Sequence, residues 1–163
     1  MKVEVYDDFL EEEQFRWVQR EMLGSSFNWK LASVLNPEID NLSCSDLENI
    51  QFSNWMYRGL EPGGPEYGIV QNIVGDPRLG ITALVRIKAN LTMRTSKVIT
   101  HGFHKDGECH HTSAIYYVNS NDGYTEFEDG TQIESVENRL LVFDSQISHT
   151  GSTCTNARVR CVI

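Results

Sequence analysis

The sequence predicts a mainly β protein with helices near its N-terminus, and three observations support this fold class. Short apolar segments rich in Val, Ile, Tyr and Phe follow one another from residue 84 onward. Turn-forming groups such as Asn-Asp-Gly and Asp-Gly separate these segments. Helical periodicity is confined to the first 80 residues or so. Many short strands behind two helices indicate a jelly roll or a small barrel.

The N-terminal part of the chain is expected to support the sheet. Residues 3–6 are a strand candidate, and Asp8 followed by Glu11 has the spacing of a capping box that opens a helix. Three apolar residues then share one helical stripe: Phe15, Val18 and Met22. Residues 25–66 show no clear pattern, whereas residues 69–74 predict a second short helix.

Strands are expected from residue 84 to the end of the sequence. Residues 84–91 alternate, which places Arg86, Lys88 and Asn90 on one face and apolar residues on the other. Further strand candidates span residues 97–103, 112–119, 124–127, 131–135, 140–144 and 158–163.

Length and charge limit the classes of function. The chain is expected to be one domain, 1–163, with helical support over roughly 8–80 and a jelly-roll core over roughly 84–163. Its net charge of −9 repels phosphate backbones, so no nucleic-acid partner is expected. No membrane partner is expected either, because no run approaches the ~20 apolar residues of a spanning helix. Without a secretory signal or a C-x-x-C pattern, we expect a cytoplasmic protein with free thiols.

The candidate metal ligands are two histidines and one aspartate. His104 and Asp106 are separated by one residue, so an extended chain would place both on the same face. Gly102 and Gly107 flank this pair, and the distant His149 could close a three-point clamp. Two histidines and one carboxylate on one side of a metal form the facial triad of non-haem Fe(II) oxygenases. A single histidine on a strand is more often structural, however, and an H-x-D pair also arises by chance.

Two arginines follow the last of these histidines. Arg158 and Arg160 are two positions apart and would share one face of the final strand. A guanidinium is the preferred bidentate partner of a carboxylate, so an inward arginine near a metal clamp suggests an anionic co-substrate. The alternative is a pair of surface arginines on an edge strand of an acidic protein.

Residues 84–163 resemble the Fe(II)- and 2-oxoglutarate-dependent dioxygenases, most of all their prolyl-hydroxylase-like branch. The matching segments are FHKD (103–106), AIYYVN (114–119), NDGYTEF (121–127), NRLLVFD (138–144), SHTG (148–151) and VRCVI (159–163). The resemblance implies an α+β chain that is mainly β, with N-terminal helices and a double-stranded β-helix core of the cupin-like jelly-roll type.

The same resemblance assigns roles to residues around the cofactors. It implies that His104, Asp106 and His149 are the catalytic metal ligands and that the metal is Fe(II). 2-Oxoglutarate and O2 would be co-substrates, with ascorbate as a reductant, and an unactivated C–H bond would be hydroxylated with release of succinate and CO2. The substrate would be a prolyl or other peptidyl residue, or a small molecule. Because Asp106 fills the carboxylate position, halogenation is not expected.

Further positions are assigned to the site that binds 2-oxoglutarate. The resemblance favours Arg160 as the anchor of the distal carboxylate, with Arg158 as the alternative, and Tyr117 as a hydroxyl donor to the same group. Asn90 and Lys88 would face the interior and touch the co-substrate or the substrate. The remaining histidines match no ligand position and are expected at the pocket rim or in loops: His101, His110 and His111.

Two other interpretations of the sequence stay open. One is a cupin-like metal protein with the same barrel and triad that does not use 2-oxoglutarate. The other is a metal-free jelly-roll binding module. Oligomeric state has no signature in the sequence.

Overall fold

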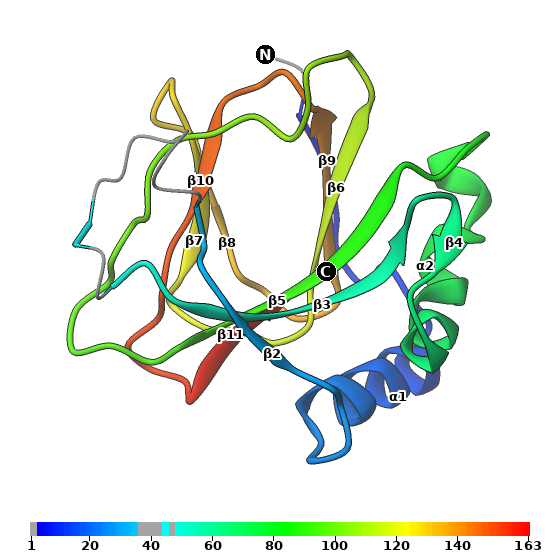
Figure 1. Ribbon diagram of the computed structural model, residues 1–163, viewed down its shortest axis with the longest axis horizontal. Helices are drawn as coiled ribbons and strands as arrows, with labels where there is room; N and C mark the ends of the chain where they lie inside the picture. Colours follow the sequence, from blue (N-terminus) through cyan, green and yellow to red (C-terminus); the bar gives the residue numbers. More distant parts are fainter. Residues whose placement is uncertain (1–2, 36–43, 46–47) are drawn as a thin grey trace.

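The computed structural model describes residues 3–35, 44–45 and 48–163, and two antiparallel β-sheets dominate it (Figure 1). In chain order the elements are β1 (Val3–Tyr6), α1 (Glu12–Leu23), β2 (Lys30–Ala32), β3 (Gln51–Arg58), β4 (Glu61–Pro62), η1 (Pro65–Val70), α2 (Gln71–Val74), η2 (Pro77–Leu79), β5 (Arg86–Met93), β6 (Thr112–Tyr117), β7 (Tyr124–Phe127), β8 (Gln132–Glu134), β9 (Arg139–Asp144), β10 (His149–Gly151) and β11 (Val159–Val162). The larger sheet has the order β1-β9-β6-β11-β5-β3-β2, with β4 paired to β3, and the smaller sheet has the order β10-β7-β8. The mainly β prediction with N-terminal helices is confirmed.

The helices cover one side of the large sheet. Phe15, Val18 and Met22 of α1 are buried in one cluster with Ile87 and Ala89 of β5. Burying a large apolar side chain of this kind contributes roughly 1.5–3 kcal/mol. The opposite face of β5 carries the alternate residues and lines a cavity, as the alternation in the sequence predicted.

Aromatic side chains join the two sheets beside that cavity. Phe127 of β7 and Phe143 of β9 meet edge to face, with ring centroids 5.2 Å apart. Both belong to a second buried cluster with Leu141 of β9 and Val162 of β11. This contact between sheets fixes the position of β10, which carries His149 next to Phe127 in register.

The start of α1 differs from the prediction. The helix begins at Glu12, and Asp8 has a positive φ of 50° rather than an N-cap conformation. Asn138 explains the delay, because its side chain accepts from the Leu10 amide at 2.9 Å and donates to the Leu10 carbonyl at 2.8 Å. These bonds hold the chain extended before α1 can begin.

The prediction of a strand at residues 97–103 was wrong, because this segment forms only an isolated bridge between Thr100 and Ser152. Threonine hydroxyls replace the carbonyl partners that a ladder would require. Thr153 accepts from the Ile99 amide at 3.0 Å, and Thr150 accepts from the Gly102 amide at 3.3 Å. The segment is therefore an ordered loop pinned to the chain that follows β10.

The unpatterned region contains an eight-residue strand, β3, that sequence periodicity missed. Several of its inward positions are polar, and carbonyl groups of a neighbouring segment satisfy them. Gln51 donates to the Ser33 carbonyl at 2.8 Å, and Asn54 donates to the Asn28 carbonyl at 2.9 Å. Buried amides of this kind break the apolar alternation by which strands are recognised.

Two other expectations concern the thiols and the membrane. Cys44, Cys109, Cys154 and Cys161 all remain thiols, as expected. None of the described helices combines the length and the apolar character that a bilayer span requires.

Candidate active site

Backbone pairing brings the two candidate histidine ligands together. His104 and His149 form a reciprocal bridge, in which each amide donates to the other carbonyl at 2.9 Å. Their imidazole centroids consequently lie 4.6 Å apart although the residues are 45 positions apart in the chain. The Asp106 amide donates to the Ser145 carbonyl at 3.1 Å, which holds the loop beside the bridge.

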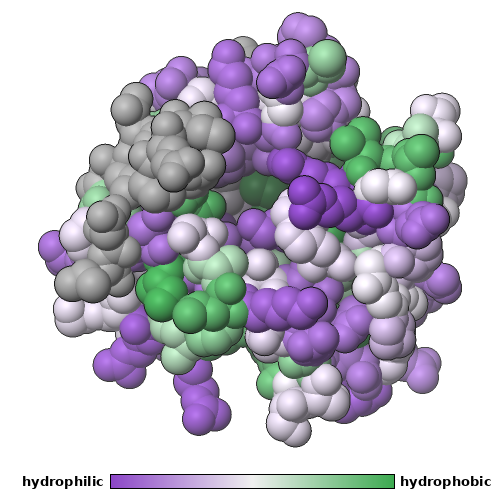
Figure 2. Space-filling view, in the orientation of Figure 1, coloured by the Kyte–Doolittle hydropathy of each residue, from purple (hydrophilic) through white to green (hydrophobic). Residues whose placement is uncertain are grey.

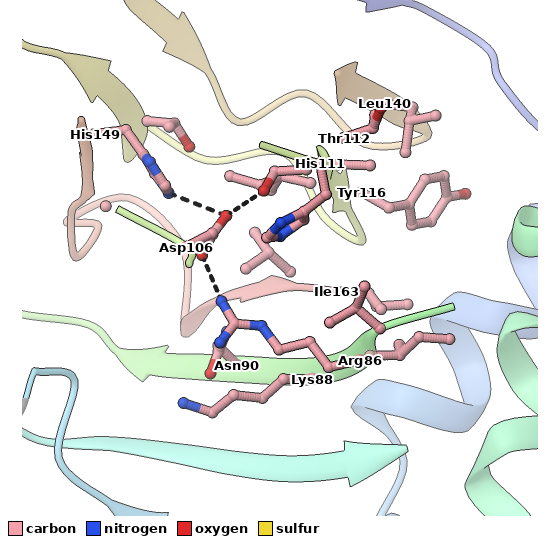
Figure 3. Close-up of a pocket in the computed structure, with 18 of the residues that line it drawn as sticks. Arg86, Lys88, Asn90, Asp106, His111, Thr112, Tyr116, Leu140, His149 and Ile163 are labelled. Carbon is pink, nitrogen blue, oxygen red and sulfur yellow. Dashed lines mark hydrogen bonds and ion pairs between the residues drawn. The ribbon is translucent and has the colours of Figure 1, made fainter. Parts of the chain in front are cut away.

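The three side chains converge on one point. One ligand atom from each of His104, Asp106 and His149 lies within 4.8 Å of the other two. His149 Nε2 is 3.8 Å from Asp106 Oδ2 (Figure 3). Two donors on one ion lie at most about 4.2 Å apart when each bond is near 2.1 Å, so this pair fits a shared metal. Two imidazoles and a carboxylate suit a non-haem Fe(II) ion.

The hydrogen bond of His149 selects its tautomer. Nδ1 lies 3.1 Å from the Ile147 carbonyl, which can only accept, so Nδ1 carries the proton. Nε2 then keeps its lone pair and faces Asp106. Phe143 packs edge to face on this ring at 4.7 Å between centroids. The ring is thus oriented as metal-binding histidines usually are, by a bond from the nitrogen that does not bind the metal.

Asp106 has two further partners that sequence reasoning did not find. Ser113 donates to Oδ2 at 2.6 Å, and Arg86 Nη2 lies 2.7 Å from Oδ1 (Figure 3). Burial raises the pKa of Asp106, but the Ser113 hydrogen bond and the nearby His149 and Arg86 outweigh burial, so the pKa falls below its usual 3.8. The carboxylate is therefore ionised and oriented before any metal arrives.

A buried cation lies in the same cavity. Arg160 of β11 is 6% exposed, its Nε donates to Ser135 Oγ at 2.9 Å, and its Nη2 donates to Thr125 Oγ1 at 3.1 Å. Burial lowers its pKa, yet a guanidinium stays charged in proteins. No carboxylate of the described residues forms an ion pair with it. A buried charge with only neutral partners is costly, and an anionic ligand would offset that cost.

Close packing around Arg160 requires a glycine. A Cβ on Gly123 would lie 2.7 Å from Arg160 Cδ and 2.7 Å from the Thr153 carbonyl oxygen. Polar atoms without partners among the described residues line the same cavity: Asn90 Oδ1, Thr92 Oγ1 and His101 Nε2. A compact polar anion fits this end of the cavity.

The structure separates the other residues that were expected to contact 2-oxoglutarate. Asn90 lines the cavity, but Arg158 is exposed on the bend before β11 and does not. Tyr117 is buried behind Thr125, to which its hydroxyl donates at 2.8 Å, and it does not line the cavity itself. Tyr117 thereby fixes the Thr125 hydroxyl beside Arg160.

The three remaining histidines occupy different environments. His101 is buried in the cavity wall, 3.4 Å from the Gly151 carbonyl through Nδ1, and burial lowers its pKa. His111 lines the cavity from a loop. His110 is exposed and 2.9 Å from Asp144. None of the three belongs to the metal-binding group.

The cavity that contains both sites has a volume of about 680 Å³, within the range of small-molecule sites. Figure 2 shows the molecule hollowed near the middle of this face, with strongly hydrophilic side chains along one side of the hollow. The triad, Arg160 and the polar residues of β5 all lie on its wall. The fold therefore places the three candidate metal ligands and the buried Arg160 around one cavity.

Known proteins share this architecture. The sequence matches no protein-family model and no curated protein. Among solved structures, a viral collagen prolyl hydroxylase from Paramecium bursaria Chlorella virus-1 in complex with 2-oxoglutarate is 12% identical, with a TM-score of 0.61 over 99% of this chain and 93% of that chain. An oxidoreductase of the 2-oxoglutarate-Fe(II) oxygenase family from Burkholderia pseudomallei is 11% identical, with a TM-score of 0.66 and coverage of 98% and 82%.

A third similar structure is a prolyl hydroxylase from Trichoplax adhaerens in complex with a hypoxia-inducible-factor peptide fragment. It is 16% identical, with a TM-score of 0.67, over 98% of this chain and 80% of that chain. The chain thus has the jelly-roll fold of the 2-oxoglutarate-Fe(II) oxygenases, including prolyl hydroxylases. The fold implied by the sequence resemblance is confirmed.

Proposed function

We propose that the chain is a single Fe(II)- and 2-oxoglutarate-dependent dioxygenase domain that hydroxylates an unactivated C–H bond. The observation that carries this proposal is the buried Arg160 in the same cavity as the triad His104, Asp106 and His149. A metal site alone would also suit a cupin-like protein. The buried cation adds the requirement for an anionic ligand at a fixed place in the cavity.

The residues of the chain bind and orient the reactants. Asp106 and the two imidazoles would hold Fe(II), and the Ile147 carbonyl keeps His149 Nε2 unprotonated toward it. When bound, Fe(II) supplies the chemistry by which O2 oxidises 2-oxoglutarate to succinate and CO2 and converts C–H into C–OH. Ascorbate would serve as a reductant that keeps the metal divalent.

Arg160 would bind the distal carboxylate of the co-substrate, with the Thr125 hydroxyl beside it. Burial strengthens this ion pair because little water screens it. The Thr92 hydroxyl, which lacks a partner among the described residues, would donate to an oxygen of the co-substrate, and Asn90 would contact the co-substrate through its side-chain NH2 group. The Tyr117 hydroxyl would act through Thr125.

A peptidyl substrate, prolyl among the candidates, is supported by one similar structure, a prolyl hydroxylase in complex with a peptide fragment. The likeness to that protein is one of fold, so the class of substrate is proposed by analogy. A small-molecule substrate is the alternative that the same cavity volume would admit.

The test is anaerobic addition of Fe(II) and then 2-oxoglutarate, with the weak visible charge-transfer band of the chelate as the readout. His149→Ala should abolish the band and the binding of Co(II), because it removes one of three metal ligands. His110→Ala is the matched control, since His110 is exposed and outside the triad. Equal loss in both variants would contradict the assignment of His149.

The two rival functions have distinct outcomes in the same assay. A protein that takes up Fe(II) but forms no band with 2-oxoglutarate would be a cupin-like metal protein. A protein that takes up neither Fe(II), Co(II) nor Ni(II) would be a metal-free binding module. Either result would refute the proposal.

A further inference from the structure

The wall of the cavity has the opposite charge to the rest of the protein. Among the residues that the structure describes, four basic side chains line it, namely Arg86, Lys88, Lys105 and Arg160, and one acidic side chain does, that of Asp106. The whole chain carries 14 basic and 23 acidic residues. Positive charge is thus concentrated at the cavity in a protein that otherwise repels anions.

The proposed cofactors leave most of this charge uncompensated. Fe(II) brings two positive charges and 2-oxoglutarate brings two negative charges, which cancel. Asp106 offsets one of the four basic side chains, so a net charge of +3 remains on the described lining. Besides Arg160, the cations of this lining are Arg86, which is ion-paired with Asp106, Lys88 and Lys105. A further anion inside the cavity would balance them.

Lys88 is the most constrained of these three cations. Lys88 is half-buried, and its Nζ lies 5.3 Å from the ring centroid of Trp55, which is its cross-strand partner on β3. Burial and the neighbouring Arg86 lower its pKa. No carboxylate of the described residues forms an ion pair with it, so the aromatic ring is its main support.

Arg86 contributes donors beside Lys88. One of its nitrogens, Nη2, contacts Asp106, and a guanidinium has five N–H donors, so others stay available. Arg58 of β3 is the cross-strand partner of Arg86, and its guanidinium is 4.7 Å from the Trp55 ring centroid. The Trp55 ring therefore contacts two cations, Arg58 on its own strand and Lys88 on β5. Figure 3 shows Arg86 reaching toward Asp106 while Lys88 extends along β5 toward Asn90.

We propose that Arg86 and Lys88, supported by Trp55, form a subsite for an anionic group of the substrate, and that the enzyme selects substrates carrying a carboxylate or a phosphate. This inference rests on the proposed function, because the subsite is defined beside the iron and 2-oxoglutarate sites. The anion would approach over β5, next to the triad, so that a neighbouring C–H bond faces the metal.

The rival role for Lys88 is a second contact with 2-oxoglutarate itself. Lys88 is four residues along β5 from Thr92, the strand partner of Arg160. At roughly 3.3 Å per residue the two backbone positions are about 13 Å apart, which favours separate ligands. The affinity for 2-oxoglutarate distinguishes these roles directly.

The experiment measures succinate release by the Fe(II)-loaded full chain with charge-paired compounds. Each pair consists of an acidic compound and its neutral counterpart. The first set is blocked tripeptides with Glu or Gln, or Asp or Asn, on either side of proline. The second set is the same amino acids in free form, and the third is phosphomonoesters with their parent alcohols. Stimulation confined to acidic members supports the inference, and the peptide and phosphate sets reveal which anion is used. Equal stimulation by the neutral members, or none by any pair, overturns it.

Variants assign the effect to the subsite. Lys88→Gln should raise the KM for the best acidic compound at least tenfold, while the KM for the co-substrate 2-oxoglutarate changes less than twofold. Lys88→Arg should restore most of the loss, and Lys30→Gln, an exposed control on β2, should have no effect. An increase confined to the KM for the co-substrate would overturn the subsite. Circular dichroism checks that each variant is folded. The charge-transfer band with 2-oxoglutarate tests the proposed function independently, because its absence in the unmodified protein would refute that function whatever the result for the subsite.

Discussion

Two cationic regions of the cavity are built in different ways. At the inner region, Arg160 is buried, contacts Ser135 and Thr125, and fits against Gly123 with no spare room. At the outer region, the Arg86 side chain is 42% exposed and one nitrogen contacts Asp106. The inner site is fixed in shape and suits one constant ligand, whereas the outer wall is open and suits a ligand that varies.

The largest effect is expected at the inner region. Arg160→Met should weaken 2-oxoglutarate binding at least about 100-fold, because it removes a charge-assisted bond in a site with little water. Arg158→Met should change it less than twofold, since Arg158 is exposed outside the cavity. Titration of the charge-transfer band measures both. Equal losses in the two variants would contradict the assignment of the buried Arg160 as the anchor of 2-oxoglutarate.

A middle-sized effect is expected at Ser113, which donates a hydrogen bond to Asp106 beside the outer region. Ser113→Ala should lower the free energy of unfolding of the metal-free protein by about 1 kcal/mol at neutral pH. Because the folded pKa of Asp106 lies below 3.8, this contribution is present above the unfolded pKa and is lost as pH falls through the folded pKa. Urea unfolding of both proteins between pH 7 and pH 3 should show the difference shrinking. A difference independent of pH would contradict it.

The smallest effect is expected at Lys88, and it has the opposite sign. Lys88→Met should raise the free energy of unfolding by roughly 0.5–1 kcal/mol, because it removes a half-buried charge without an acidic partner. The pKa of Lys88 is lowered in the folded state, so the charged side chain destabilises the fold at every pH below that folded pKa. The stability gained in Lys88→Met should therefore shrink as the pH rises through the folded pKa toward the unfolded pKa. Urea unfolding at pH 7 and pH 10 would measure it. A loss of stability would show that Lys88 is structural.

The sequence predicted the parts of the fold that repeat locally. In β5, alternate positions carry Arg86, Lys88 and Asn90, which line the cavity, and Ile87 and Ala89 between them belong to the buried cluster that contains α1. In β3, by contrast, buried amides such as Gln51 are satisfied by carbonyls 18 residues away. Such partners exist only after folding, so periodicity could not reveal the strand.

The candidate site was predictable to a similar extent. The spacing of His104 and Asp106 indicated a shared face, and the structure brings both beside His149 without a regular strand. The contact of Arg86 with Asp106 joins residues 20 positions apart. Nothing in the local spacing marks it, because it depends on how a loop crosses the sheet. The alternation of β5 could have suggested only that Arg86 faces inward.

The reciprocal bridge between His104 and His149 has a consequence for metal exchange. The backbone of each histidine holds the other in place, so the two imidazoles come together when the loop that carries His104 pairs with β10, before any ion enters. Iron would then bind to a preorganised site, and its binding would require little further ordering of the chain. Chelators should accordingly strip the ion and other divalent ions should replace it while the sandwich stays folded.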